Sequence, residues 1–200
     1  MPRVPAHENP FAVERTDSLP FVVQGTNWDE LLPRLQSMQW RGAIVGPHGH
    51  GKTTMLEELE RRLEMRGECV ARFTLNSADR KLPVAAFAAR EVILLDGAEQ
   101  LSPWAWRKFV WATRHARGLV ITTHRHGRMP TWYECRTSPE LLVSFLNRLA
   151  PNDIDTIYPI AERLLATHEG NIRMVLRCLY DHYAGRPVHT SVVGATRSRS

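Results

Sequence analysis

The chain has 200 residues, of which 43% are apolar and 24% are charged. This composition is typical of a folded globular protein and excludes a largely disordered chain. No apolar run approaches the roughly 18 residues that a membrane-spanning helix needs, and the N-terminal residues lack the apolar core of a signal peptide. The three cysteines are odd in number and far apart, which favours free thiols in a reducing compartment. We therefore expect a cytoplasmic protein without membrane insertion.

The first forty residues predict little regular structure. Residues 1–25 are rich in proline and lack hydrophobic periodicity, so we expect an extended arm. A short helix follows, capped by Asn27 or Asp29 and ending near Met38, because apolar residues recur there at helical spacing.

The middle of the chain alternates between strand and helix patterns. Short apolar runs predict strands over 42–46, 68–75, 91–95, 118–123 and 131–135, and helices are expected over 53–66 and 102–116. Such alternation predicts an α/β fold in which helices cover both faces of a mostly parallel five-stranded sheet, a three-layer α/β/α arrangement.

Only helices are expected after the last strand, over 138–149, 153–168 and 171–184. The final residues are polar and basic, so we expect a flexible basic tail. The chain thus divides into an N-terminal arm with a short helix (1–40), an α/β core (41–136), a helical segment (137–185) and a tail (186–200).

The most informative segment lies between the first predicted strand and the helix after it. It matches the phosphate-binding pattern GxxxxGK[ST] through the residues Gly46, Pro47, His48, Gly49, His50, Gly51, Lys52, Thr53 and Thr54. Glycines let backbone N–H groups turn towards an anion, and the helix start adds partial positive charge. We expect Lys52 to lie between the β- and γ-phosphates of a nucleotide and Thr53 to bind Mg²⁺. His48 and His50 occupy variable positions of the pattern and are expected to face solvent.

A carboxylate ends the third predicted strand. Asp96 follows four apolar residues and is expected beside the phosphate loop, where it would help to hold Mg²⁺. Hydrolysis also needs a group that orients water. The position after Asp96 is Gly97, so we assign this catalytic role to the next acid, Glu99. The structural alternatives are a helix cap for Asp96 and an exposed first-turn position for Glu99.

Polar residues end the fourth predicted strand as well. The carboxyl ends of parallel strands meet at one crevice, so Thr123 and His124 are catalytic candidates that would reach the γ-phosphate or the attacking water. Arg125 and Arg128 follow directly. Either arginine would serve as a finger in a neighbouring copy, as a lid residue or as a solvated surface charge.

By these motifs the chain resembles the P-loop NTPases of the additional-strand group. The phosphate loop, Asp96 and the strand end at 122–124 look like the two Walker motifs and sensor 1. The segment 170–173 looks like the sensor 2 helix of the AAA+ branch. The motif Asn9-Pro10-Phe11 is similar to one in small AAA-type ATPases related to transposition, secretion and replication-initiator proteins.

This resemblance implies a sheet ordered 5-1-4-3-2, ATP and Mg²⁺ as ligands, a helical lid and a contact from Arg173 to the nucleotide. The chain departs from the family pattern at Gly97, where an acid is usual, and this departure predicts slow or switch-like hydrolysis. The link between the last two strands is too short for the helix that usually carries an arginine finger. This short link argues against assembly into a ring. A protein partner and a homo-oligomer are the two alternatives for an interaction partner.

The segment from Trp104 to Arg128 is strongly basic in a chain whose net charge is +5. It carries six basic residues and no acid, and three tryptophans are interleaved with them. Basic and aromatic side chains together predict phosphate contacts and base stacking, so a nucleic-acid partner is one interpretation. The other is that the tryptophans pack the helix onto the sheet and the charges form its solvated face.

The leading functional hypothesis is an ATP-binding protein that hydrolyses ATP with Mg²⁺ and acts as a nucleotide-driven regulator or motor component. One alternative is a small-molecule kinase with a phosphate loop, which is disfavoured because no acceptor-binding domain is evident. Another is a nucleic-acid-binding adaptor that uses ATP only as an allosteric ligand.

Overall fold

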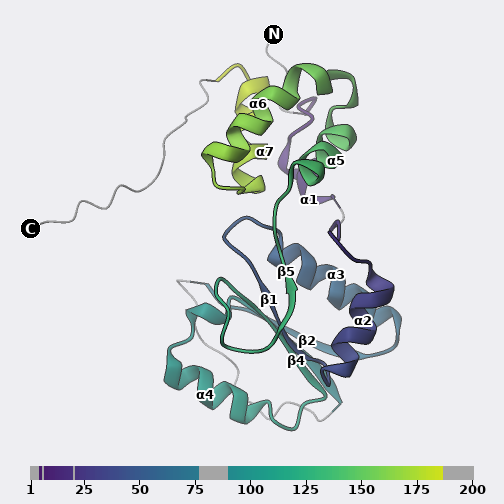
Figure 1. The fold of residues 1–200 in the computed structure, drawn as a ribbon, viewed down its shortest axis with the longest axis vertical. Helices are drawn as coiled ribbons and strands as arrows, with labels where there is room; N and C mark the ends of the chain where they lie inside the picture. Colours follow the sequence, from purple (N-terminus) through teal and green to yellow (C-terminus); the bar gives the residue numbers. More distant parts are fainter. Residues whose placement is uncertain (1–4, 6, 20, 77–89, 187–200) are drawn as a thin grey trace, which may run out of the picture. The chain divides into compact units, whose positions relative to one another are not determined.

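The computed structural model describes residue 5 and residues 7–19, 21–76 and 90–186. The chain divides into two compact units, shown in Figure 1. The sheet unit spans Pro20–Arg136, and the helical unit combines Met1–Leu19 with Thr137–Ser200. The N-terminal stretch that we expected as one segment is thus divided between the two units.

The sheet unit is built on five strands, β1 (Arg41–Val45), β2 (Cys69–Thr74), β3 (Glu91–Asp96), β4 (Gly118–Thr123) and β5 (Thr131–Glu134). Their order is β2-β3-β4-β1-β5, and all neighbouring pairs are parallel. This is the expected order 5-1-4-3-2 read from the opposite edge, so the predicted α/β class and strand order are confirmed. Because the strands are parallel, the residues that follow β1, β3 and β4 meet at one edge of the sheet.

Helices cover both faces of the sheet. They are α2 (Trp28–Ser37), α3 (Lys52–Met65), the 3-10 helix η1 (Ala98–Gln100) and α4 (Pro103–Ala112). Leucines of α2 and α3 share one apolar core with the fully buried Trp132 of β5. Ala98 of η1 and Phe109 of α4 belong to a separate core on the other face. The sheet unit therefore has the expected three layers.

Several helices start where predicted because capping side chains set their first turns. Asn27 accepts a hydrogen bond from the N–H of Glu30 at the start of α2, and Ser102 caps α4 in the same way. Helix α4 ends at Ala112, before the predicted end at residue 116. The buried Thr113 follows it, and its hydroxyl donates to carbonyls of the last turn, which favours a helix end there.

The helical unit contains α1 (Val13–Asp17), α5 (Pro139–Leu149), the 3-10 helix η2 (Pro151–Asp153), α6 (Ile154–Thr167) and α7 (Ile172–Tyr183). Helices α5, α6 and α7 confirm the three predicted helices. The expectation of an extended arm is wrong at α1, which adds one helical turn. In the part of the chain that the structure describes, no helix has the length and apolar character to cross a membrane. All but the first residue of the predicted tail lie outside the described residues.

Asn9 joins the N-terminal stretch to α7. Its side chain is fully buried, its Nδ2 donates to the carbonyl oxygen of Tyr180 at 2.9 Å, and its Oδ1 accepts from the N–H of Phe11 at 3.0 Å. The ring of Phe11 packs against Tyr183, with 5.4 Å between ring centroids. The segment Asn9-Pro10-Phe11 therefore forms part of the core of the helical unit.

We expect Asn9→Ala to lower the free energy of unfolding by about 1–3 kcal/mol, because the buried N–H of Phe11 loses its acceptor and the carbonyl oxygen of Tyr180 loses one of its two donors. Urea denaturation followed by circular dichroism measures the change. The matched control is Glu14→Ala on α1, an exposed residue for which the change should stay within about 0.5 kcal/mol. Equal stabilities for the two variants would contradict this structural role of Asn9.

Candidate functional site

The loop at residues 46–51 joins β1 to α3, and its glycines are required by its geometry. A Cβ atom on Gly46 would lie 2.6 Å from the carbonyl oxygen of Cys135, so no larger residue fits there. Gly51 has a φ of 81°, a left-handed conformation that suits glycine, and it is the N-cap of α3. The first N–H groups of α3 have no partner within the helix, so the loop ends at groups that favour an anion.

Lys52 is the first residue of α3, and its ammonium lies at this loop. The side chain is only 8% exposed. Its Nζ donates to the carbonyl oxygen of Pro47 at 2.7 Å and lies 3.2 Å from Nδ1 of His124, which follows β4. A loop carbonyl and the imidazole of His124 thus hold the Lys52 ammonium, the group that the sequence motif predicts to bind phosphate.

Asp96, at the end of β3, is held from two sides. The hydroxyl of Thr53 donates to its Oδ2 at 2.9 Å, and the hydroxyl of Thr122 donates to its Oδ1 at 2.5 Å. Thr122 in turn accepts from the N–H of Gly97 at 2.8 Å. Each carboxylate oxygen therefore has a hydroxyl donor, which fixes the orientation of the carboxylate at the edge of the sheet.

Sequence reasoning placed Thr122 only within the strand end at 122–124 and missed its contact with Asp96, naming Thr123 and His124 as the catalytic candidates. Side chains alternate along a strand, so Thr122 and Thr123 point to opposite faces of β4. Thr122 reaches Asp96, whereas the hydroxyl of Thr123 donates to the carbonyl oxygen of Arg125 at 3.2 Å. The parallel pairing of β3 with β4, combined with this alternation, was the signal that could have identified Thr122.

The hydroxyl of Thr53 and the carboxylate of Asp96 are hard oxygen donors that suit Mg²⁺. Among the described residues there is no group of three or more histidine, cysteine or acidic side chains that could hold a metal ion. Mg²⁺ commonly takes only one or two protein ligands and completes its shell with waters and substrate phosphates. The donor pair therefore fits a Mg²⁺ ion that arrives with a nucleotide.

His124 connects Lys52 to Glu99. Its Nε2 lies 2.7 Å from Oε1 of Glu99, and its Nδ1 faces the ammonium of Lys52. Because an ammonium only donates, Nδ1 must accept, and Nε2–H then donates to the carboxylate. This network assigns a neutral imidazole. Burial, and then the charge of Lys52, lower the pKa of His124, while Glu99 opposes this shift.

His48 of the loop stacks on His124, with 3.7 Å between ring centroids, and it also lowers the pKa of His124. The side chain of His48 is exposed, as expected, but it also covers one face of the imidazole that contacts Lys52. The ring of His50 lies against the carbonyl oxygen of His48 and is half-buried.

The left-handed backbone at Gly97 excludes an acidic residue directly after Asp96, and the next acid in the sequence is Glu99. Gly97 has a φ of 84°, and a Cβ atom there would lie 2.5 Å from the carbonyl oxygen of Leu75. A carboxylate cannot be placed directly after Asp96. The 3-10 helix η1 instead carries Glu99 to His124, and the second oxygen of Glu99, Oε2, is buried without a hydrogen-bond partner among the described residues.

The two arginines after β4 differ. Arg125 is exposed, whereas Nη2 of Arg128 donates to the carbonyl oxygen of Leu101 at 2.6 Å. Burial lowers the pKa of Arg128, and the charge of Glu99 opposes this shift. Arg173 is exposed in the first turn of α7, in the helical unit, so its contact with a nucleotide stays a prediction.

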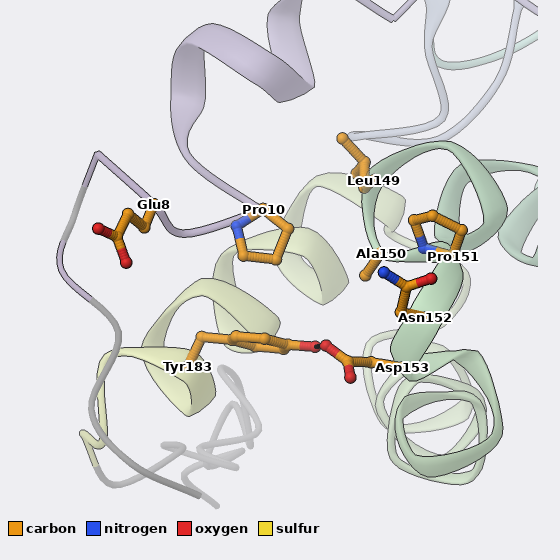
Figure 2. Close-up of a pocket in the computed structure, with 8 residues that line it drawn as sticks. All are labelled: Glu8, Pro10, Leu149, Ala150, Pro151, Asn152, Asp153 and Tyr183. Carbon is orange, nitrogen blue, oxygen red and sulfur yellow. Dashed lines mark hydrogen bonds between the residues drawn. The ribbon is translucent and has the colours of Figure 1, made fainter.

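A separate hollow of about 270 Å³ lies within the helical unit (Figure 2). It is lined by Glu8, Pro10, Leu149, Ala150, Pro151, Asn152, Asp153 and Tyr183. In Figure 2 the hydroxyl of Tyr183 points to Asp153, to which it donates at 2.7 Å. Burial raises the pKa of Tyr183, so this phenol stays protonated and joins α7 to η2.

The lowered pKa of His124 predicts a pH-dependent stability. In the pH window between the lowered pKa of His124 in the folded protein and its value of about 6.5 in the unfolded chain, the unfolded chain binds more protons than the folded one. The free energy of unfolding therefore falls as the pH drops through that window. We expect His124→Gln, which keeps a donor and an acceptor, to lose less stability than the wild type between pH 7.5 and 5. Urea denaturation at each pH measures this loss. The exposed His115 supplies the control, and His115→Gln should follow the wild type. An unchanged slope in His124→Gln would contradict the assignment of a neutral imidazole.

Comparison with known proteins does not assign the chain to a family. No protein-family model matches the chain, and a search of curated proteins found no significant match. The motifs and the contacts of their residues are therefore the basis for inferring a function.

Proposed function

We propose that this chain binds ATP together with Mg²⁺ and hydrolyses it slowly, as a nucleotide-dependent switch. The observation that carries the proposal is the convergence of Lys52, Thr53 and Asp96 at one edge of a parallel sheet, directly after a glycine loop. Lys52 and Thr53 are adjacent residues of the GxxxxGK[ST] motif on α3, whereas Asp96 comes from the end of β3 and contacts Thr53. This contact between distant parts of the sequence supports the proposal.

Binding follows from the charges at this edge. The N–H groups at the start of α3 and the ammonium of Lys52 are donors for phosphate oxygens. A bound triphosphate would compete with Pro47 and His124 for Lys52, since both contact its Nζ. When bound, Mg²⁺ neutralises charge on the phosphates, and the residues that would hold it are Thr53 and Asp96.

For hydrolysis, Glu99 supplies the group that accepts a proton. Its Oε1 is fixed by His124, and its Oε2 is buried without a partner among the described residues, so Oε2 can accept from a water. The water oxygen forms a bond to the γ-phosphorus, the bond from that phosphorus to the bridging oxygen breaks, and ADP leaves with that electron pair. The water proton passes to Oε2. His124 is a positioning residue, because it links Glu99 to Lys52.

Lys52→Ala should lower the affinity for ATP by about 10- to 100-fold, because hydrogen bonds from a charged donor contribute about 1.5–3 kcal/mol. Isothermal titration with ATP and Mg²⁺ measures the affinity. The exposed Lys108 of α4 provides the control, and Lys108→Ala should bind as the wild type does. Identical affinities for wild type and Lys52→Ala would remove the basis of this proposal.

Glu99→Gln should reduce the rate of ATP hydrolysis by about 10²- to 10⁴-fold while ATP affinity stays near that of the wild type, because a general base is lost and the phosphate contacts remain. Phosphate release under single-turnover conditions measures the rate. Wild-type turnover in Glu99→Gln would refute the role of Glu99 but not nucleotide binding. ADP release that requires an added small-molecule acceptor would instead favour a kinase.

A further inference from the structure

Helix α4 presents two large indoles to solvent. Trp104 and Trp111 are each 67% exposed, and Val110 between them is 36% exposed. Phe109 and Trp106 attach the helix to the sheet, since Phe109 is part of the apolar core on that face and Trp106 packs against it. The interpretation that all three tryptophans of this segment pack onto the sheet is therefore wrong for Trp104 and Trp111.

Cationic groups accompany both exposed indoles. The Nζ of Lys108 lies 3.4 Å from the ring centroid of Trp104, and the guanidinium carbon of Arg114 lies 3.8 Å from that of Trp111. Lys108 lies one turn after Trp104 on α4, whereas Arg114 lies just beyond the helix end and reaches back over Trp111. The surface therefore carries alternating aromatic and positive groups.

A surface hollow of about 400 Å³ lies along the same helix. It is lined by Trp106, Arg107, Val110, Trp111 and Arg114, with two positive charges and no acid. The basic residues of this region differ in their contacts. Arg117 is paired with Glu68 at 2.7 Å, and the half-buried Arg128 donates to the carbonyl oxygen of Leu101. Arg114 also donates to a backbone carbonyl oxygen, that of Trp111 at 2.8 Å, but its side chain is exposed. The exposed positive charge of this surface is therefore carried by Arg107, Lys108 and Arg114.

We propose that this surface of α4 and the residues directly after it, which we call the tryptophan face (Trp104, Arg107, Lys108, Val110, Trp111 and Arg114), binds single-stranded nucleic acid. Its charge is complementary to a phosphate backbone, and its exposed indoles offer surfaces on which unpaired bases can stack. Trp104 and Trp111 are seven residues apart, or about 10 Å along a helix. A base-paired duplex hides its base faces, so stacking of this kind selects unpaired strands.

The test is a fluorescence-anisotropy titration of the full chain with a labelled deoxythymidine 20-mer, without nucleotide. We expect Trp104→Ala and Trp111→Ala each to weaken binding by about 5- to 100-fold, because one stacked base is lost in each. Removing the charges of Arg107, Lys108 and Arg114 together should weaken binding and reduce its salt dependence. The slope of log K against log salt should decrease in magnitude by about 2, because three phosphate contacts are lost.

Matched controls lie at the C-terminal end of α3, at the opposite face of the sheet. Met65 is 74% exposed, and Arg66 is exposed beside it, so Met65→Ala and Arg66→Ala should leave binding unchanged. Circular dichroism confirms that each variant is folded. Lys52→Ala should also bind the 20-mer as the wild type does, which separates this proposal from the one for ATP.

Three outcomes would overturn the proposal. One is the absence of binding to the 20-mer at 50 mM salt, and another is binding that neither tryptophan variant weakens. The third is a preference for a polyglutamate peptide over the 20-mer, which would assign the tryptophan face to an acidic protein segment instead.

Discussion

The candidate site depends on the carboxylate of Asp96 and the two threonine hydroxyls that hold it. Thr53 comes from the helix after the glycine loop and Thr122 from the neighbouring strand, so one carboxylate joins three elements of the sheet unit. Parallel pairing makes this contact possible, because it brings the carboxyl ends of β3 and β4 to the same edge. Lys52, one residue before Thr53, is thereby placed beside His124, two residues after Thr122.

A steric constraint explains how the site departs from the family pattern that it resembles. The backbone at Gly97 is left-handed and lies against a carbonyl oxygen, so an acid cannot occupy the usual position after Asp96. Glu99 reaches the same region from η1 and is fixed through an imidazole. An acid fixed in this way is coupled to Lys52, since one neutral ring contacts both charged groups.

The sequence was sufficient to predict the α/β class and the position of the glycine loop, because both follow from local patterns whose period and spacing are specific. The strand order was implied by the resemblance to P-loop NTPases and not by any local pattern. Thr122 was missed because its role depends on which neighbour it faces across the sheet. The pairing of Glu99 with His124 joins two loops, and no local pattern specifies it. The exposure of Trp104 and Trp111 was equally undetermined, since aromatic residues at helical spacing fit a core face and a binding face alike.

The hydrogen bond between Asn9 and Tyr180 joins residues that are 171 positions apart. On the ribosome, the whole of the sheet unit is synthesised between these two residues, and domains generally fold as they emerge. The core that contains Phe11 can therefore close only after α7 has left the ribosome, long after Phe11 itself was made. The N-terminal stretch must therefore remain available throughout translation, and the sheet unit is the first part of the chain able to reach its final structure.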